Sequence, residues 1–374
     1  MKLIIEKETL VNNLENVSRA LSTRNIIPVL NGIKFKVTKE GLYLTASDND
    51  ISIEIFVDKV DIKSIEEEGE LVISGGSKLL EILRKLPNND MTIESYEENM
   101  IFFKTPNFEY KSNCYPKEEY PDINFEESDK YAVVNSNKVR EMISKTSFAC
   151  SLQESRPLFT GINVKLTNNN LEFVATDSYR LSKMQIEIDN KEENDFNIVI
   201  PARNINELLK VLNKEDNVYI HIFSNKVLFK YNNIKFQSSL INGGTYPNTD
   251  NSIPKSFEST IKVNIKEFFN VVDRASLVSQ FKDKNIIEME IVNDKLTIRA
   301  SSVDVGKIEE SIIVDNVSKS NIKISYSAKY MIDALKIFNK ENIFILLNGD
   351  ISPIILMEED NDELTELISP MKTF

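Results

Sequence analysis

The segment Ile33-Lys-Phe-Lys-Val37 recurs twice along the chain, as Ile162-Asn-Val-Lys-Leu166 and as Ile287-Glu-Met-Glu-Ile291. In each copy apolar and polar residues alternate, which is typical of a half-buried β-strand. The copies begin 129 and 125 residues apart. Each is followed by a second apolar segment, which contains Ala46-Ser-Asp48, Ala175-Thr-Asp177 or Ala300-Ser-Ser302. The chain is therefore predicted to contain three copies of one unit.

Two helices are expected in each repeat, because apolar residues recur there at steps of three and four and so share one helical face. In the first repeat these are Leu10, Leu14, Val17 and Leu21, and then Leu79, Ile82, Leu83 and Leu86. The six expected helices span residues 9–22, 77–86, 136–149, 204–214, 264–277 and 327–340.

Segments of strand length follow each expected helix, which gives every repeat two β-α-βββ units with antiparallel strands. The predicted fold class is α+β. Tyr120-Pro121 and Tyr246-Pro247 introduce polar joints between the repeats. We therefore expect three similar domains at residues 1–125, 130–254 and 257–374.

The composition is typical of a soluble globular protein, since 41% of the 374 residues are hydrophobic and 28% are charged. No apolar run approaches the roughly 18 residues of a membrane span. The first residues lack the uncharged core of a secretory signal, and two cysteines are too few for a disulfide framework. A cytoplasmic protein that makes no membrane contact is expected.

Positive charge is concentrated in the expected helices. They hold 14 basic and 7 acidic residues, whereas the rest of the chain holds 31 basic and 51 acidic residues. This separation favours helices that face a polyanion, although Lys and Arg are also common on solvated helix faces. The net charge of −13 therefore does not exclude nucleic acid as a partner.

Enzyme chemistry has little support in the sequence. Ser320-Asn-Ile-Lys323 fits a Ser-x-x-Lys pattern without companion motifs, and Ser74-Gly-Gly-Ser-Lys78 lacks the spacing of a phosphate loop. The only histidine, His221, lies in an expected strand. The carboxylates of Asp48-Asn-Asp50 and of residues 358–362 could hold a cation, but a turn and a solvated loop explain them as well. No cofactor or metal is expected.

Several segments together resemble the DNA polymerase III beta subunit family. They occur in order and in register with the repeat: Arg24-Asn-Ile-Ile-Pro28, Leu44-Thr-Ala-Ser-Asp48, Arg84-Lys-Leu-Pro87, Val174-Ala-Thr-Asp-Ser-Tyr-Arg-Leu181, Val199-Ile-Pro-Ala-Arg203, Tyr246-Pro247 and Ser369-Pro-Met-Lys372. The resemblance implies a non-catalytic sliding clamp with three DNA-clamp domains. In this family two chains close head to tail into a ring, with helices lining the interior and antiparallel sheets outside.

The resemblance implies contacts with double-stranded DNA that do not depend on base sequence, because phosphates carry no sequence information. Arg24 and Gln153 match DNA-contacting positions of the family, and Arg203 is a further candidate. Basic residues of the expected helices complete the predicted set, namely Lys78, Arg84, Lys138 and Lys145.

A second implied site is a pocket for the short peptides of partner proteins, which typically carry glutamine followed by hydrophobic residues. The matching positions are Phe159, Thr176, Tyr179, Arg180, Leu181, Pro247, Tyr330, Ile351, Pro353, Leu367, Ile368, Pro370 and Met371. Two positions depart from the family pattern. The pair Ser178-Tyr179 stands where glycine or other small residues occur with histidine or tyrosine, and Ser369 replaces a larger apolar residue.

The partners implied are a second copy of the chain, a clamp loader, the DNA polymerase III alpha subunit and other proteins with clamp-binding peptides. Tyr110, Leu277 and Val278 are the candidates for the dimer interface. The alternative hypothesis is a peptide-binding scaffold of three repeats that does not bind DNA, since repeats and a peptide pocket also fit that function.

Overall fold

The computed structural model describes the chain except for residues 22–26, 98, 191–193, 280–284, 319–320 and 372–374. The chain forms two compact units. The first comprises Met1–Arg140, Asn190–Asn194 and Arg203–Leu240, and the second comprises Glu141–Asp189, Asp195–Ala202 and Ile241–Phe374.

The order of elements confirms the threefold repeat and the α+β class. Strands and helices follow one another as β-α-βββ-β-α-βββ three times, with β5 (Ile62–Glu67) and β22 (Asp315–Asn316) as additional strands. The six α-helices in the described part are α1 (Lys7–Val17), α2 (Gly76–Arg84), α3 (Ser136–Thr146), α4 (Ala202–Val211), α5 (Ile265–Ser279) and α6 (Ala328–Leu335). Their apolar stripes are buried as the spacing predicts, for example Leu10 and Leu14 of α1 and Leu79 and Leu83 of α2.

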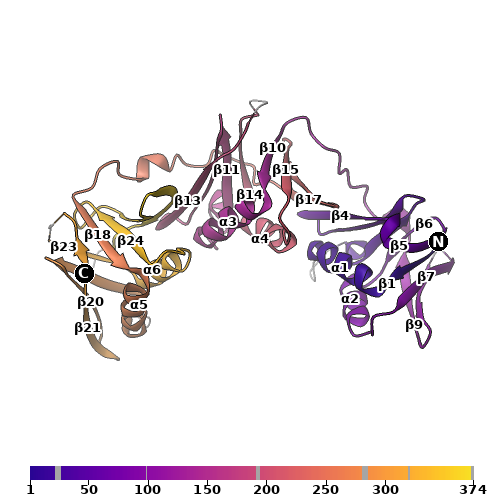
Figure 1. Ribbon diagram of the computed structural model, residues 1–374, viewed down its shortest axis with the longest axis horizontal. Helices are drawn as coiled ribbons and strands as arrows, with labels where there is room; N and C mark the ends of the chain where they lie inside the picture. The colour runs from indigo at the N-terminus through magenta and orange to yellow at the C-terminus, as the bar shows by residue number, and fades with distance from the viewer. Residues whose placement is uncertain (22–26, 98, 191–193, 280–284, 319–320, 372–374) are drawn as a thin grey trace. The chain divides into compact units, whose positions relative to one another are not determined.

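The first unit is built on one antiparallel sheet of 13 strands. Its order is β10 (Tyr131–Asn135), β15 (Asn217–Ile222), β16 (Lys226–Tyr231), β17 (Ile234–Ser239), β4 (Ile51–Asp58), β3 (Gly41–Ser47), β2 (Ile33–Val37), β6 (Gly69–Ile73), β9 (Phe108–Tyr115), β8 (Met100–Thr105), β7 (Asp90–Glu97), β1 (Lys2–Glu6) and β5. Helices α1 and α2 pack side by side, and α1 also covers β3 and β4 (Figure 1). The apolar faces of the helices and the strands that they cover form the core.

The second unit contains one antiparallel sheet of nine strands and another of four. The first has the order β14 (Phe196–Pro201), β11 (Gly161–Thr167), β12 (Asn170–Thr176), β13 (Arg180–Glu187), β26 (Asn361–Ile368), β25 (Ile354–Glu358), β24 (Asn342–Leu347), β18 (Ser259–Asn264) and β22. The second has the order β21 (Gly306–Ile313), β20 (Lys295–Ser302), β19 (Ile286–Val292) and β23 (Ile322–Ser327). Helix α5 packs against α6 and against β20 and β21.

Strand pairing crosses the boundaries between repeats. Strand β17 of the middle repeat pairs with β4 of the first, and β13 of the middle repeat pairs with β26 of the last. The compact units therefore divide the middle repeat, because its strands complete the sheets of both neighbours. Among the described residues, no helix has the length and apolar character needed to span a bilayer.

Candidate functional site

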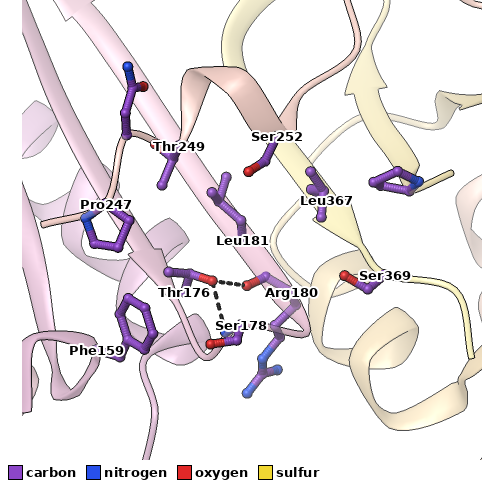
Figure 2. A pocket seen from close by; sticks show the side chains of 12 residues that line it. Phe159, Thr176, Ser178, Arg180, Leu181, Pro247, Thr249, Ser252, Leu367 and Ser369 are labelled. Carbon is purple, nitrogen blue, oxygen red and sulfur yellow. Dashed lines mark hydrogen bonds between the residues drawn. The ribbon is translucent and has the colours of Figure 1, made fainter. Parts of the chain in front are cut away.

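A cavity of about 390 Å³ opens on the second unit, where the turn between β12 and β13 meets the end of β26 (Figure 2). Apolar side chains form one side of the cavity, and short polar side chains form most of the remainder. The lining residues are Phe159, Thr176, Ser178, Arg180, Leu181, Pro247, Asn248, Thr249, Ser252, Pro353, Leu367 and Ser369.

Leu181 of β13 and Leu367 of β26 form the apolar floor of the cavity, because the two strands place them directly opposite each other. Side chains at such opposed positions lie on the same face of a sheet, roughly 5 Å apart. Both belong to a buried cluster that includes Tyr246, and Phe159 packs against this cluster. The Phe159 and Tyr246 rings meet edge to face, with their centroids 6.0 Å apart. An apolar ligand side chain would therefore meet a preformed surface.

The turn between β12 and β13 forms part of the polar side. The Thr176 hydroxyl donates to the Arg180 carbonyl at 2.6 Å and accepts the Ser178 N–H at 3.0 Å (Figure 2). Asp177 Oδ1 accepts the N–H groups of Tyr179 and Arg180, at 2.9 and 3.1 Å. Side-chain bonds of this kind stabilise tight turns. They hold Ser178 at a φ of 80°, which residues with a Cβ rarely adopt.

The backbone of Ser178 leads to a prediction about stability. We expect the Ser178→Gly variant to have a free energy of unfolding about 1 kcal/mol higher than Ser178→Ala, because glycine adopts a positive φ without a Cβ clash. Both variants lose the 2.9 Å bond that Arg156 Nη1 donates to the serine hydroxyl, so the comparison isolates the backbone. Denaturant titration measures the difference, and equal stability of the two variants would contradict the prediction.

Arg180 anchors this turn to α6. Its guanidinium donates to Asp177 at 3.1 Å and to Asp333 at 2.8 Å. It also lies over the rings of Tyr330 and Phe148, 4.7 and 5.3 Å from their centroids. Only 10% of the side chain is exposed, and Figure 2 shows the guanidinium directed away from the apolar floor. Arg180 therefore stabilises the turn, and its charge is neutralised by carboxylates outside the cavity.

About half of the residues predicted for the peptide pocket line the cavity. Those in the lining are Phe159, Thr176, Arg180, Leu181, Pro247, Pro353 and Leu367. Tyr179 and Tyr330 lie beside it and stack on each other at 6.5 Å between centroids. Pro370 and Met371 follow β26 outside the lining, and Ile351 is largely exposed.

Ile368, which was also predicted for the pocket, lies outside the cavity lining. Successive side chains of a strand point to opposite faces, so Leu367 faces the cavity and Ile368 points into the core, where it is fully buried. The prediction missed the polar lining residues Asn248, Thr249 and Ser252. Their one signal in the sequence is that they lie within five residues of the Tyr246-Pro247 motif.

The residues predicted to contact DNA differ in their exposure. Arg24 lies outside the described residues. Gln153 is exposed in the segment between α3 and β11, and Lys138 is half-buried on α3. Arg203 is 59% exposed at the start of α4 and donates to Asp48 at 2.5 Å.

Lys78 and Arg84 both lie exposed on α2. Lys78 donates to Glu81 at 2.8 Å and holds the pKa of that carboxyl below its usual value. Arg84 donates to Glu15 of α1 at 2.7 Å. Exposed ion pairs such as these are weak, so both cations remain able to exchange a carboxylate for a phosphate.

Among the described residues predicted to contact DNA, Lys145 is the least exposed. Its side chain is 9% exposed, and its ammonium pairs with Glu141 of the same helix at 2.8 Å. A phosphate contact would require breaking this pair at a buried position. The DNA contact of Lys145 therefore stays a prediction that requires this pair to open.

The residues predicted for the dimer interface lie on surface elements. Tyr110 is half-buried on β9, with its ring 6.2 Å from that of Phe103. Leu277 is 56% exposed near the end of α5, and Val278 beside it is half-buried. Strand β21, which packs against α5, is an edge strand of its sheet.

The described residues offer little that fits catalysis. Burial raises the pKa of Cys114 to about 11 and that of Cys150 to about 12, so both thiols stay protonated near neutral pH. His221 belongs to strand β15, and its Nδ1 lies 2.8 Å from the carbonyl oxygen of Ser128. Asp48 accepts backbone N–H groups of its own turn. In the part of the chain that the structure describes, no group of three His, Cys, Asp or Glu side chains could hold a metal ion.

Comparison with known proteins identifies the family. Models for the three domains of the DNA polymerase III beta subunit match in order, with the N-terminal domain at residues 1–124, the central domain at 133–248 and the C-terminal domain at 251–372. The chain belongs to the DNA polymerase III beta subunit family. This confirms the resemblance inferred from the motifs. The chain therefore has three clamp domains, and its function is that of a non-catalytic sliding clamp.

Individual relatives match over their full length. The chain is 33% identical to the beta sliding clamp of Bacillus subtilis strain 168 and 31% identical to that of Staphylococcus epidermidis strain RP62A, with all of each chain covered. The crystal structure of the Bacillus subtilis DNA polymerase sliding clamp superposes with a TM-score of 0.94 at 33% identity. The DNA polymerase III beta chain of Streptococcus pneumoniae TIGR4 gives 0.93 at 30% identity. Both structures are covered completely.

Proposed function

We propose that two copies of this chain close head to tail into a ring around duplex DNA and tether the DNA polymerase III alpha subunit and other partners to it. The full-length match to beta sliding clamps, across all three domains, carries this proposal. A closed ring retains DNA topologically, so individual phosphate contacts need only be weak and independent of sequence. A clamp loader opens and places the ring. Because the chromosome is its site of action, we place the chain in the cytoplasm.

The DNA contacts proposed are the exposed basic residues Lys78, Arg84 and Arg203, together with Lys138, Gln153 and Arg24. Lys78 and Arg84 can transfer from their exposed carboxylate partners to a phosphate when DNA is present, since a solvated ion pair contributes little. Arg203 pairs with the buried Asp48, but its side chain is 59% exposed and has further N–H donors for a phosphate. Binding should therefore weaken as salt is added, in the way that counterion release predicts.

The cavity on the second unit is the proposed site for partner peptides. An extended peptide could place apolar side chains on Leu181 and Leu367, while the amide of Asn248 and the hydroxyl of Ser252 offer hydrogen bonds. Ligand sites typically combine an apolar surface with placed polar groups, and this cavity has both. Tyr179 and the Pro370-Met371 segment flank the cavity and extend the proposed surface.

The dimer contact is proposed to involve the β9 region around Tyr110 on one copy and the end of α5 on the other. Exposed Leu277 beside the edge strand β21 supports this assignment, because unpaired strand edges and exposed apolar residues favour association.

Retention on DNA tests the proposed function. With a clamp loader and ATP, the protein should stay on a nicked circular plasmid through gel filtration and should leave once a restriction enzyme linearises the plasmid. Omission of the loader is the control, and it should leave the plasmid unloaded. Equal retention on circular and linear DNA would reject a topological link, and a scaffold that does not bind DNA would be retained on neither.

A further inference from the structure

Glu366 is a buried carboxyl group directly behind the floor of the cavity. It lies on β26 opposite Ser182 of β13, next to the opposed pair Leu181 and Leu367. Because side chains alternate along a strand, Ser182 and Glu366 face the other side of the sheet from that pair. Glu366 is 2% exposed and Ser182 is fully buried.

The hydrogen bonds around Ser182 require one more proton than an ionised Glu366 allows. The Ser182 hydroxyl oxygen lies 2.6 Å from the carbonyl oxygen of Lys145, at the end of α3, and in contact with Glu366 Oε1. A serine hydroxyl carries a single proton, and neither a carbonyl nor a carboxylate can supply another. If Glu366 is a carboxylic acid, it donates to Ser182, which in turn donates to Lys145. Both contacts are then satisfied.

The charged groups near Glu366 have other partners. Arg180 of β13 pairs with Asp177 and Asp333, and Lys145 of α3 pairs with Glu141. Strand β25 places the buried and uncharged Leu356 opposite Glu366.

Glu366 itself forms no ion pair with any residue that the structure describes. Burial raises the pKa of Glu366 well above its ordinary value, and the bond to Ser182 and the charges of Arg180 and Lys145 oppose this only in part.

We propose that Glu366 is a neutral carboxylic acid that positions the peptide pocket, by joining β26 through Ser182 to β13 and to the end of α3. Loss of its proton leaves a buried charge without a partner and an unsatisfied oxygen contact at this joint. The strands then separate at the residue pair next to Leu181 and Leu367, which moves the pocket floor. The stability of this joint and the shape of the pocket floor therefore depend on pH. The effect on the pocket rests on the proposed peptide-binding function.

The direction of the pH dependence follows from the raised pKa. Between the ordinary and the raised value, the folded chain holds one proton that the unfolded chain has lost, so stability falls as pH rises. For one proton, the unfolding equilibrium constant of the wild type should increase about tenfold per pH unit relative to a variant that cannot ionise. Glu366→Gln is that variant, because its amide keeps the shape of the acid and can donate to Ser182.

The experiment compares the full-length wild type with Glu366→Gln between pH 6 and 8. Denaturant unfolding should show the wild-type to variant ratio of unfolding constants rising about tenfold for each pH unit up to the raised pKa. Glu172→Gln is the matched control, since it removes a buried carboxylate that pairs with Lys183. The variant keeps Glu366, so the wild-type to Glu172→Gln ratio of unfolding constants should not change with pH. If the wild-type to Glu366→Gln ratio were equally independent of pH, the proposal would be overturned.

Two further measurements complete the test. The infrared spectrum of the wild type near neutral pH should contain the carbonyl band of a buried carboxylic acid, and its absence would overturn the proposal even if the variant fails to fold.

A fluorescent synthetic peptide with glutamine followed by hydrophobic residues should lose affinity for the wild type at alkaline pH but not for Glu366→Gln. Parallel loss in both proteins would reject the link to the pocket. A peptide that binds neither protein at any pH would count against the proposed function, while the unfolding data still judge Glu366.

Discussion

Replacing Arg180 with alanine is expected to lower the free energy of unfolding by about 3 to 5 kcal/mol, because two carboxylates lose their cation at a largely buried site. Asp177 belongs to the turn beside the cavity and Asp333 belongs to α6, so one substitution loosens both elements. The stacking of the guanidinium over Tyr330 is lost as well. Denaturant or thermal unfolding measures the loss, and the cavity should bind peptide less well in the same variant.

Arg156→Ala is the matched control for Arg180→Ala. Arg156 is exposed near the same cavity, and its guanidinium donates to the Ser178 hydroxyl and lies 5.9 Å from the centroid of the Phe159 ring. Its removal leaves no buried charge, so stability should change by less than about 1 kcal/mol. If both variants unfolded at the same denaturant concentration, the anchoring role of Arg180 would be wrong.

Replacing Ser252 with phenylalanine is expected to weaken peptide binding at least about 30-fold, because an anchoring side chain in a pocket typically contributes 2 kcal/mol or more. Ser252 lines the cavity, and Figure 2 shows its hydroxyl turned toward Leu181. The residue is exposed and belongs to a short 3-10 helix at Asp250–Ser252, so a larger side chain can occupy the cavity without disturbing the core. Fluorescence anisotropy with a labelled clamp-binding peptide measures the affinity.

Asn251→Phe is the control for this substitution. Asn251 is the exposed neighbour of Ser252 in the same short helix and lies outside the cavity lining. The Asn251→Phe variant should bind the peptide with wild-type affinity, and both variants should remain on circular DNA. Equal affinity of the two variants would show that peptides bind elsewhere.

The repeat and its helices were predictable from the sequence because they depend on local pattern. Apolar residues at steps of three and four define a helical face whatever lies against it, and Leu10, Leu14, Leu79 and Leu83 are buried as expected. Even so, the helix expected at residues 9–22 ends at Val17 and continues as a short 3-10 turn at Ser18–Ala20. Helix ends depend on neighbouring packing as well as on periodicity.

The candidate site was predictable only in part, because side-chain direction and partners are set by contacts between distant segments. The sequence alone cannot tell that Leu367 faces a cavity while Ile368 faces the core, since both are aliphatic and adjacent. It also cannot tell that Lys145 is paired and buried while Lys78 is exposed, since both are lysines on amphipathic helices. The polar lining after Pro247 was missed for the same reason, because short polar residues in a loop have no periodic signal.

The sequence by itself determined the threefold β-α-βββ arrangement, the α+β class and, through its motifs, the clamp family. These features arise from residue types and spacings within a few turns or strands. Only the tertiary structure decided which side chains meet at the pocket and behind it. Ser182 and Glu366 are 184 positions apart, and the register between β13 and β26 alone brings them into contact. A shift of that register by one residue would exchange the cavity face of β26 for its core face.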